Sequence, residues 1–288
     1  MRIRERWDRY WYGPVPAIRL ATFRQAILFM LAIYMLARWM HAAEWLTTTG
    51  FHPTPAADRI NAPQLPLLPP ALLPAFGVGL FASIALAIFG WLRRPATLVA
   101  LLLVIYVSLA DPISAFTLNR LFILSLLVLV LAPTPDHDDA MPAWPVRVLQ
   151  LTLLIHYATS GICKSLRGDW LTSNDVLWAQ LQNIYMTDIA ALFVRMTPMW
   201  AMTLLQHVAL GFELLAPLLI GARRLRPFGL AIGVAMHIMI AATMYQLFYF
   251  SAQMLCFYLV FVDAETLQRW RARLGLGPTS PDPRGLAG

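Results

Sequence analysis

The chain alternates between long apolar runs and short polar breaks. Eight runs are predominantly apolar and approach the length of about 20 residues that crosses a bilayer: residues 18–45, 71–91, 96–110, 115–131, 146–163, 199–220, 228–244 and 248–262. The breaks are rich in proline and charged residues, as segments outside the hydrocarbon must be. The pattern predicts an all-α fold, a polytopic integral membrane helical bundle with about eight transmembrane helices. Seven and nine are the alternatives, because 96–110 and 248–262 are short.

The composition agrees with a membrane-embedded chain. Hydrophobic residues make up 59% of it and charged residues only 13%, whereas soluble domains carry about a quarter charged residues. We expect three parts: residues 1–17 as a basic, aromatic cytoplasmic or interfacial segment, 18–262 as the transmembrane domain, and 263–288 as a cytoplasmic tail that is disordered at its end.

The net charge of +7 is explained by membrane topology, because the basic residues cluster at the predicted helix ends. With eight helices, the clusters at 2–9, 93–94, 223–226 and 269–273 fall on one side. Loops on the cytoplasmic side of a membrane carry an excess of Lys and Arg, so both termini are predicted to be cytoplasmic. We expect membrane lipid as a partner, no nucleic acid, and a location in the bacterial inner (plasma) membrane.

Neither disulfides nor metal ions are expected. Cys163 and Cys256 are the two cysteines and both lie in apolar runs, which excludes a disulfide framework or a cysteine-based zinc site. The methionines of 236–244 fit core packing better than a copper site. The acidic residues of 136–139 fit an exposed loop better than a cation site.

The chemically richest stretch is the end of the run 146–163. His156, Ser160 and Lys164 follow one another at four-residue spacing, so a helix places them near one another on one face. Gly161 lacks a side chain beside the lysine, which lets a backbone or a ligand approach closely. The pattern predicts a hydrophobic helix that presents a nitrogen base at a membrane boundary.

Other ionisable residues lie inside the apolar runs. Counted from the nearest arginine at 1.5 Å per residue, His156, Glu213 and His237 each lie about 14–16 Å deep, near the midplane. By the same rise, Lys164 lies about 12 Å further toward the opposite face. Such groups are expensive in lipid and usually face a bundle interior or a wet cavity.

Each of these residues also has a structural interpretation. Lys164 fits a helix-end lysine that extends its amine to the interface, and Trp170 fits an interfacial anchor. His156 fits core packing, and His237 fits a neutral hydrogen bond between helices.

For Glu213, the structural interpretation is a carboxylate that pairs with another side chain of its own helix. His207 and Gln206 are the candidates, and Gln206 lies seven residues away on the same face.

Four features, in this order along the chain, resemble a known family. They are Asn119-Arg120 before an apolar run, Tyr157-x-x-x-Gly161-x-x-Lys164 followed by Trp170, Glu213-Leu-Leu-Ala-Pro-Leu-Leu, and His237 before a stretch with Phe248 and Phe250. Over residues 17–262 the chain is similar to vitamin K-dependent γ-carboxylases and the wider horizontally transferred transmembrane (HTTM) group.

The resemblance implies a chemistry. In the carboxylases, the lysine at the place of Lys164 deprotonates vitamin K hydroquinone, the oxygenated product abstracts a glutamate γ-proton, and carbon dioxide adds. Apolar surroundings disfavour a charged amine, which suits a base. The implied cofactors are reduced vitamin K or menaquinol with oxygen and carbon dioxide. The implied catalytic residues are Lys164, His237 and Glu213, and the substrate-binding residues are Arg120, Asn119, His156, Tyr157, Ser160, Gly161 and Trp170.

The chain also departs from the carboxylases. Arg120 stands where they carry a histidine, and an arginine can hold an anion but cannot act as a neutral base. The chain has no counterpart of the large lumenal region of the animal enzymes, so we expect no propeptide-bearing substrate.

Two function classes follow. The first is a Lys-initiated, quinol-dependent enzyme that modifies a lipid-soluble substrate or a secreted peptide. The alternative is a non-catalytic membrane factor for maturation, export or immunity of a secreted peptide of the sporulation-delaying type, with a small precursor and a partner subunit. A transporter ranks third, because no inverted repeat is visible.

Overall fold

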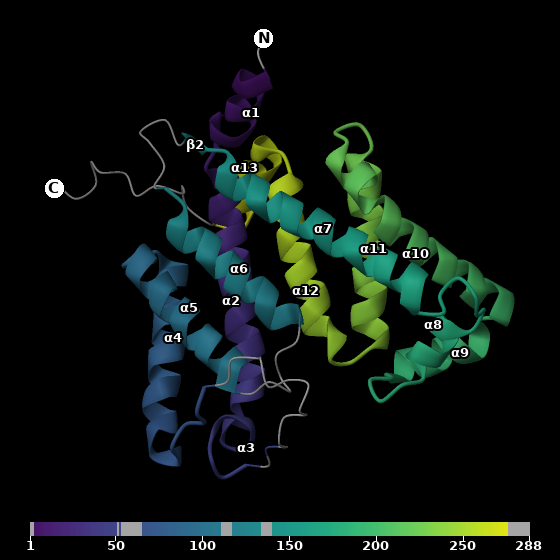
Figure 1. The fold of residues 1–288 in the computed structure, drawn as a ribbon, viewed down its shortest axis with the longest axis horizontal. Helices are drawn as coiled ribbons and strands as arrows, with labels where there is room; N and C mark the ends of the chain where they lie inside the picture. The colour runs from purple at the N-terminus through teal and green to yellow at the C-terminus, as the bar shows by residue number, and fades with distance from the viewer. Residues whose placement is uncertain (1–2, 51, 53–64, 111–116, 134–139, 276–288) are drawn as a thin grey trace. The chain divides into compact units, whose positions relative to one another are not determined.

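The computed structural model describes residues 3–50, 52, 65–110, 117–133 and 140–275 (Figure 1). The chain divides into two compact units. The N-terminal unit comprises the described residues of 13–145, and the C-terminal unit comprises those of 146–275 together with 3–12. The acidic residues 136–139 lie outside the described residues, so the expected exposed loop stays a prediction.

The N-terminal unit is a set of packed helices with one short strand pair. Helix α4 packs against α2 and α5, and α5 packs against α6. Strands β1 and β2 pair antiparallel with Val15 opposite Met141. In order, the elements are β1 (Pro14–Pro16), α2 (Ile18–Trp39), α3 (Ala42–Leu46), η2 (Pro70–Leu72), α4 (Leu73–Phe89), α5 (Arg93–Ala110), α6 (Thr117–Leu131) and β2 (Ala140–Pro142).

Arginine side chains satisfy backbone carbonyls at the helix ends of this unit. Arg24 donates to the carbonyl of Ala87 at 3.1 Å, and Arg94 donates to that of Ala132 at 2.8 Å. The last carbonyls of a helix have no partner within the helix and favour cations. The basic residues at these ends therefore tie neighbouring helices together.

The first long helix is shorter than the sequence predicted. A single helix over 18–45 was expected, but α2 ends at Trp39 and α3 follows as a separate short helix. The guanidinium of Arg38 lies 4.1 Å from the ring centre of Trp45, and Trp45 Nε1 donates to the Arg38 carbonyl at 3.1 Å. This stacked pair joins α2 and α3 across the break and stabilises it, because an arginine and an indole stack favourably.

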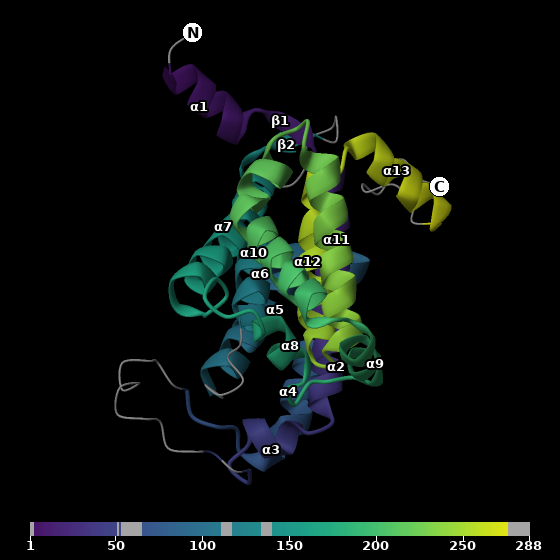
Figure 2. The same cartoon turned by 90° about the vertical axis from the view of Figure 1, so that its right-hand side faces the viewer.

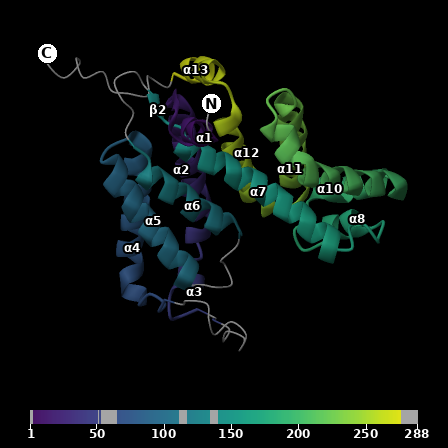
Figure 3. The ribbon, with the colours of Figure 1, turned by 45° about the horizontal axis from the view of Figure 1, so that its top comes forward.

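The C-terminal unit is also built from packed helices, several of them long (Figures 2 and 3). Helix α10 packs against α8 and α11, and α11 packs against α9 and α12. Its elements are α1 (Ile3–Tyr12), α7 (Trp144–Arg167), α8 (Val176–Leu181), α9 (Asp188–Met196), α10 (Met199–Gly221), α11 (Arg226–Thr243), α12 (Leu247–Tyr258), η4 (Leu259–Phe261) and α13 (Ala264–Arg273). The apolar stretches 178–181 and 189–194 of the sequence predict short interfacial helices, and α8 and α9 lie at these positions.

Helix α7 extends further than the run 146–163 because its polar end is also helical. Ser165 Oγ donates to the carbonyl of Gly161 at 2.8 Å within the helix. The helix ends at Arg167, and Asp169 two residues on adopts a left-handed backbone with φ of 54°. Helices commonly end near such a residue.

Within the described residues, six helices are long and apolar enough to cross a membrane, and Thr117–Leu131 and Leu247–Phe261 are shorter apolar helices. Only 22% to 44% of the residues in these six segments are buried inside the protein. Their exposed faces carry large apolar side chains such as Leu218 and Ile238. Surfaces of this kind suit contact with lipid, and the expected total of eight spans stays a prediction.

Gly229 allows α10 and α11 to pack closely against each other. A Cβ atom on Gly229 would lie 2.8 Å from the backbone carbon of Leu219, whereas nothing lies within 4 Å of the same position on Gly211 in α10. We predict that Gly229→Ala lowers the free energy of unfolding by about 1–3 kcal/mol through overpacking. Gly211→Ala should raise it by about 0.5–1 kcal/mol, because alanine favours the helix. Thermal unfolding in detergent measures both, and equal midpoints for the two variants would contradict this packing.

Candidate functional site

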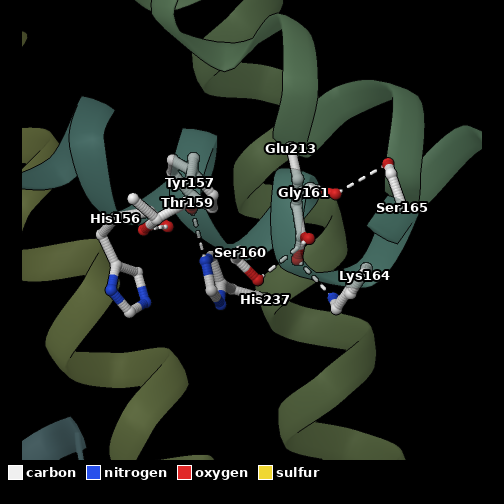
Figure 4. A network of polar contacts seen from close by, with 9 residues as sticks. All are labelled: His156, Tyr157, Thr159, Ser160, Gly161, Lys164, Ser165, Glu213 and His237. Carbon is white, nitrogen blue, oxygen red and sulfur yellow. Dashed lines mark hydrogen bonds and ion pairs between the residues drawn. The ribbon is translucent and has the colours of Figure 1, made fainter. Parts of the chain in front are cut away.

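One face of α7 carries polar side chains that bond to other helices. Tyr157, Ser160 and Lys164 are spaced at three and four residues, so they form a stripe along the helix (Figure 4). Partners come from α10, α11 and α12. The stripe confirms that Ser160 and Lys164 share a face.

Lys164 and Glu213 form an ion pair. Lys164 Nζ lies 2.6 Å from Glu213 Oε1, and Ser160 Oγ donates to Glu213 Oε2 at 3.0 Å. The side chain of Lys164 is 29% exposed and that of Glu213 is 10% exposed. Both carboxylate oxygens therefore have donors, and a cation and an anion that would each be costly in apolar surroundings neutralise each other.

This pairing corrects the expected partners of Glu213. His207 Nδ1 instead contacts the carbonyl of Thr203 in its own helix at 2.7 Å, and Gln206 bonds to the segment after α7. Counting residues from helix ends placed Glu213 level with the histidines and away from Lys164. Such counts ignore helix tilt and the length of the two side chains.

Gly161 allows the ion pair to form. A Cβ atom on Gly161 would lie 2.9 Å from the backbone nitrogen of Leu214, the residue after Glu213. The missing side chain therefore admits the backbone of α10, one of the two possibilities expected for this glycine. Any larger residue would move Ser160 and Lys164 away from Glu213.

Trp170 packs over the amine. Its ring centre lies 4.5 Å from Lys164 Nζ, and the residue is 5% exposed. The buried Gln206 holds it there by donating to the carbonyls of Trp170 at 2.9 Å and Ser173 at 2.7 Å. Trp170 thus covers the cation, a cation–π contact, rather than standing at the surface as an anchor.

A second hydrogen-bonded group lies one turn before Ser160. Tyr157 Oη lies 2.6 Å from His237 Nε2 and 2.5 Å from Tyr258 Oη. All three side chains are buried, with exposures of 2%, 1% and 4%. Rings of Phe212 and Phe250 pack against Tyr157 and His237. His237 therefore makes the hydrogen bond between helices that the structural interpretation described.

The remaining predicted residues make none of these hydrogen bonds. The ring of half-buried His156 packs 5.8 Å from that of Phe250, which agrees with a packing role. Asn119 is buried and Arg120 is exposed in α6, and both belong to the N-terminal unit. Their part in substrate binding stays a prediction.

Within the described part of the chain, no group of three or more His, Cys, Asp or Glu side chains is placed to hold a metal ion. An open hollow of about 340 Å³ lies just past the end of α7, and its lining residues include Asp169, Ser173, Val176 and Asn183. The hollow adjoins the segment that Gln206 holds.

Two features escaped the sequence reasoning. Lys164 is the only lysine in the chain, beside 21 arginines, a count that the sequence itself offers. Tyr258 gives no signal of its own in the sequence, because a tyrosine near the end of an apolar run resembles an interfacial anchor. Its role depends on Gly233, where a Cβ atom would collide with the Tyr258 hydroxyl.

Comparisons of the chain with protein-family models, with curated proteins and with solved structures find no match. The resemblance to the carboxylases therefore rests on the ordered residues alone.

Breaking the ion pair should cost stability. We predict that Lys164→Met and Glu213→Gln each lower the free energy of unfolding, toward the lower end of about 3–5 kcal/mol because Lys164 is partly exposed. The double variant should recover much of the loss, since neither charge is then left alone.

Thermal unfolding in detergent checks this cycle. Glu44→Gln is the matched control, because the His41–Glu44 pair has side chains that are 69% and 75% exposed and such pairs contribute little. Additive losses in the double variant would show that the two charges do not interact.

Proposed function

We propose that the protein is an integral membrane enzyme that removes a proton from the hydroxyl group of a lipid-soluble substrate. The Lys164–Glu213 pair is the acid–base group. The observation that carries the proposal is the position of the only lysine: its amine is bonded to a carboxylate between two apolar helices. An ionisable pair in such a place most often marks a functional site.

The choice of lysine supports proton transfer over simple charge pairing. Arginine supplies every other basic side chain, 21 in number, including those that bind carbonyls at helix ends. An arginine would pair with Glu213 equally well or better, but it does not release its proton. A lysine, unlike an arginine, lets the amine change its protonation state.

The proton step follows from the pair. When the proton shared by Nζ and Oε1 lies on the Glu213 carboxyl group, the neutral Lys164 amine accepts the proton of a substrate hydroxyl, and the resulting ammonium stabilises the substrate anion. One O–H bond of the substrate breaks, one proton joins the pair, and the total charge is conserved.

The substrate class that fits best is a quinol. A hydroquinone hydroxyl is acidic enough for such a base, and an isoprenoid tail suits a site reached from lipid. Ile162 and Leu166, which flank Lys164 on α7, are 48% and 76% exposed. The resemblance to the γ-carboxylases extends the proposal to reduced vitamin K or menaquinol with oxygen and carbon dioxide, and to a secreted peptide as acceptor.

We further propose eight membrane spans with both termini in the cytoplasm, in a bacterial inner membrane. The two shorter apolar helices supply the seventh and eighth spans. In the C-terminal unit, Arg226 donates to the carbonyl of Ile220 at 3.0 Å, so the α10–α11 turn carries fixed basic charge. Positive charge at such turns favours the cytoplasmic side.

The direct test uses Lys164→Arg, which keeps the positive charge but cannot act as a base. Protein in lipid nanodiscs is given a menaquinol-type quinol and oxygen, and oxidised or epoxidised quinone is quantified by mass spectrometry. We expect Lys164→Arg and Glu213→Gln to lose activity by about 100-fold or more, the size typical of general acid–base catalysis.

Ser165→Ala is the matched control, because Ser165 bonds only within α7, and it should keep full activity. Wild-type activity in Lys164→Arg would exclude the amine as a base. No turnover by the wild-type protein would instead leave the non-catalytic role in handling a secreted peptide as the better account.

A further inference from the structure

Three buried groups form a continuous hydrogen-bonded chain across α11, α7 and α12. His237 Nε2, Tyr157 Oη and Tyr258 Oη are joined by contacts of 2.6 and 2.5 Å. Each group can both donate and accept a hydrogen bond while staying uncharged. Neutral groups of this kind cost far less in an apolar helix bundle than ions do.

Both ends of this hydrogen-bonded series have room for a further hydrogen bond among the described residues. Nδ1 of His237 is buried and has no hydrogen-bond partner, although the residue is only 1% exposed. At the other end, the Tyr258 hydroxyl makes its one side-chain hydrogen bond to Tyr157. A buried nitrogen without a partner is costly and calls for an explanation.

The three protons of this hydrogen-bonded series, one on the imidazole and one on each hydroxyl, have two equivalent arrangements. In the first, Nε2 donates to Tyr157, Tyr157 donates to Tyr258, and the proton of Tyr258 points away. In the second, Nδ1 carries the histidine proton, Tyr258 donates to Tyr157, and Tyr157 donates to Nε2. One proton entering at Nδ1 and one leaving from Tyr258 convert the first into the second, with no charged group left behind.

Close packing holds the oxygens and the nitrogen in line. A Cβ atom on Gly233 would collide with the Tyr258 hydroxyl and lie 3.0 Å from the Phe212 ring. The Phe212 ring in turn meets that of Tyr157 edge to face, with centroids 5.3 Å apart. The glycine therefore creates the space that the hydroxyl of Tyr258 occupies.

The hydrogen-bonded series leads away from Lys164, along the α7 stripe. Tyr157 lies nearly two turns before Lys164 in α7, and the end of α12 lies closer still to the start of α7, where Gln150 donates to the carbonyl of Val260 at 2.9 Å. A proton that enters at His237 thus leaves on the side where α7 begins.

We propose that His237, Tyr157 and Tyr258 form a reversible proton relay through the C-terminal unit. A hydroxylic donor, water or the substrate hydroxyl, gives a proton to Nδ1 of His237, and a water molecule takes one from Tyr258. The relay rests on the proposed function only where the substrate is the proton donor; with water as the donor it does not. Its existence is testable without any turnover.

The test is hydrogen exchange at the His237 ring. Protein labelled with ¹⁵N-histidine is transferred to D₂O in nanodiscs, and the ring N–H signals are followed by NMR. His237→Gln identifies the signal among the six histidines. In wild type the buried N–H should exchange through the relay, and Tyr157→Phe and Tyr258→Phe should slow the exchange by about 100-fold.

The controls separate the relay from loosened packing. Tyr245→Phe removes the hydroxyl of a residue that is 73% exposed and should leave the exchange rate unchanged. Thermal midpoints are measured for every variant, because loosened packing speeds the exchange whereas loss of the relay slows it. Gly233→Ala keeps every relay group but displaces the Tyr258 hydroxyl, so it should slow exchange as the phenylalanine variants do.

Equal or faster exchange in Tyr157→Phe would overturn the relay, and so would a wild-type rate as slow as that of Tyr258→Phe. The two proposals fail separately: a relay with no quinol turnover removes the proposed function alone, and turnover without the relay effect removes this inference alone.

Discussion

A charge inside an apolar helix bundle must be neutralised by a partner, and here the partner of Lys164 is Glu213. The contact of 2.6 Å between Nζ and Oε1 links α7 to α10. Three local features serve it: Gly161 admits the backbone of α10, Ser160 binds the second carboxylate oxygen, and Trp170 covers the amine. The helices and loops of this unit are positioned so that neither charge faces lipid without a partner.

The two polar groups on α7 have different chemistry. The Lys164–Glu213 pair carries charge and is partly exposed, so it can meet a substrate. The Tyr157–His237–Tyr258 group is buried and neutral, so it can pass a proton but cannot hold an anion cheaply. Placing a charged pair and a neutral chain on one helix face lets proton abstraction and proton movement be separated.

Much of the fold could be predicted from the sequence, because the length and apolarity of a run decide whether a helix can cross a membrane. The short helices α8 and α9 also followed from their apolar pattern. The break after α2 did not, since it lies inside one continuous apolar run, and the β1–β2 pair of proline-containing strands gave no periodic signal.

The sequence indicated which residues belong to the candidate site better than it indicated which of them contact one another. Helical spacing placed Ser160 and Lys164 on one face, and the cost of buried charge singled out Glu213 and His237. Which of them pair depends on how helices tilt and cross, and residue counts contain no such information. The role of Tyr258 was hidden for the same reason, because it depends on the glycine at position 233 of another helix.

The central claim is that the single lysine amine lies against the Glu213 carboxylate, and solid-state NMR in lipid bilayers can measure this. Because Lys164 is the only lysine, ¹⁵N-lysine labelling gives one side-chain amine signal. We predict strong dipolar coupling from that nitrogen to a ¹³C-labelled glutamate carboxyl carbon, and its loss in Glu213→Gln. An amine with no such coupling, or one whose coupling persists in Glu213→Gln, would contradict the account.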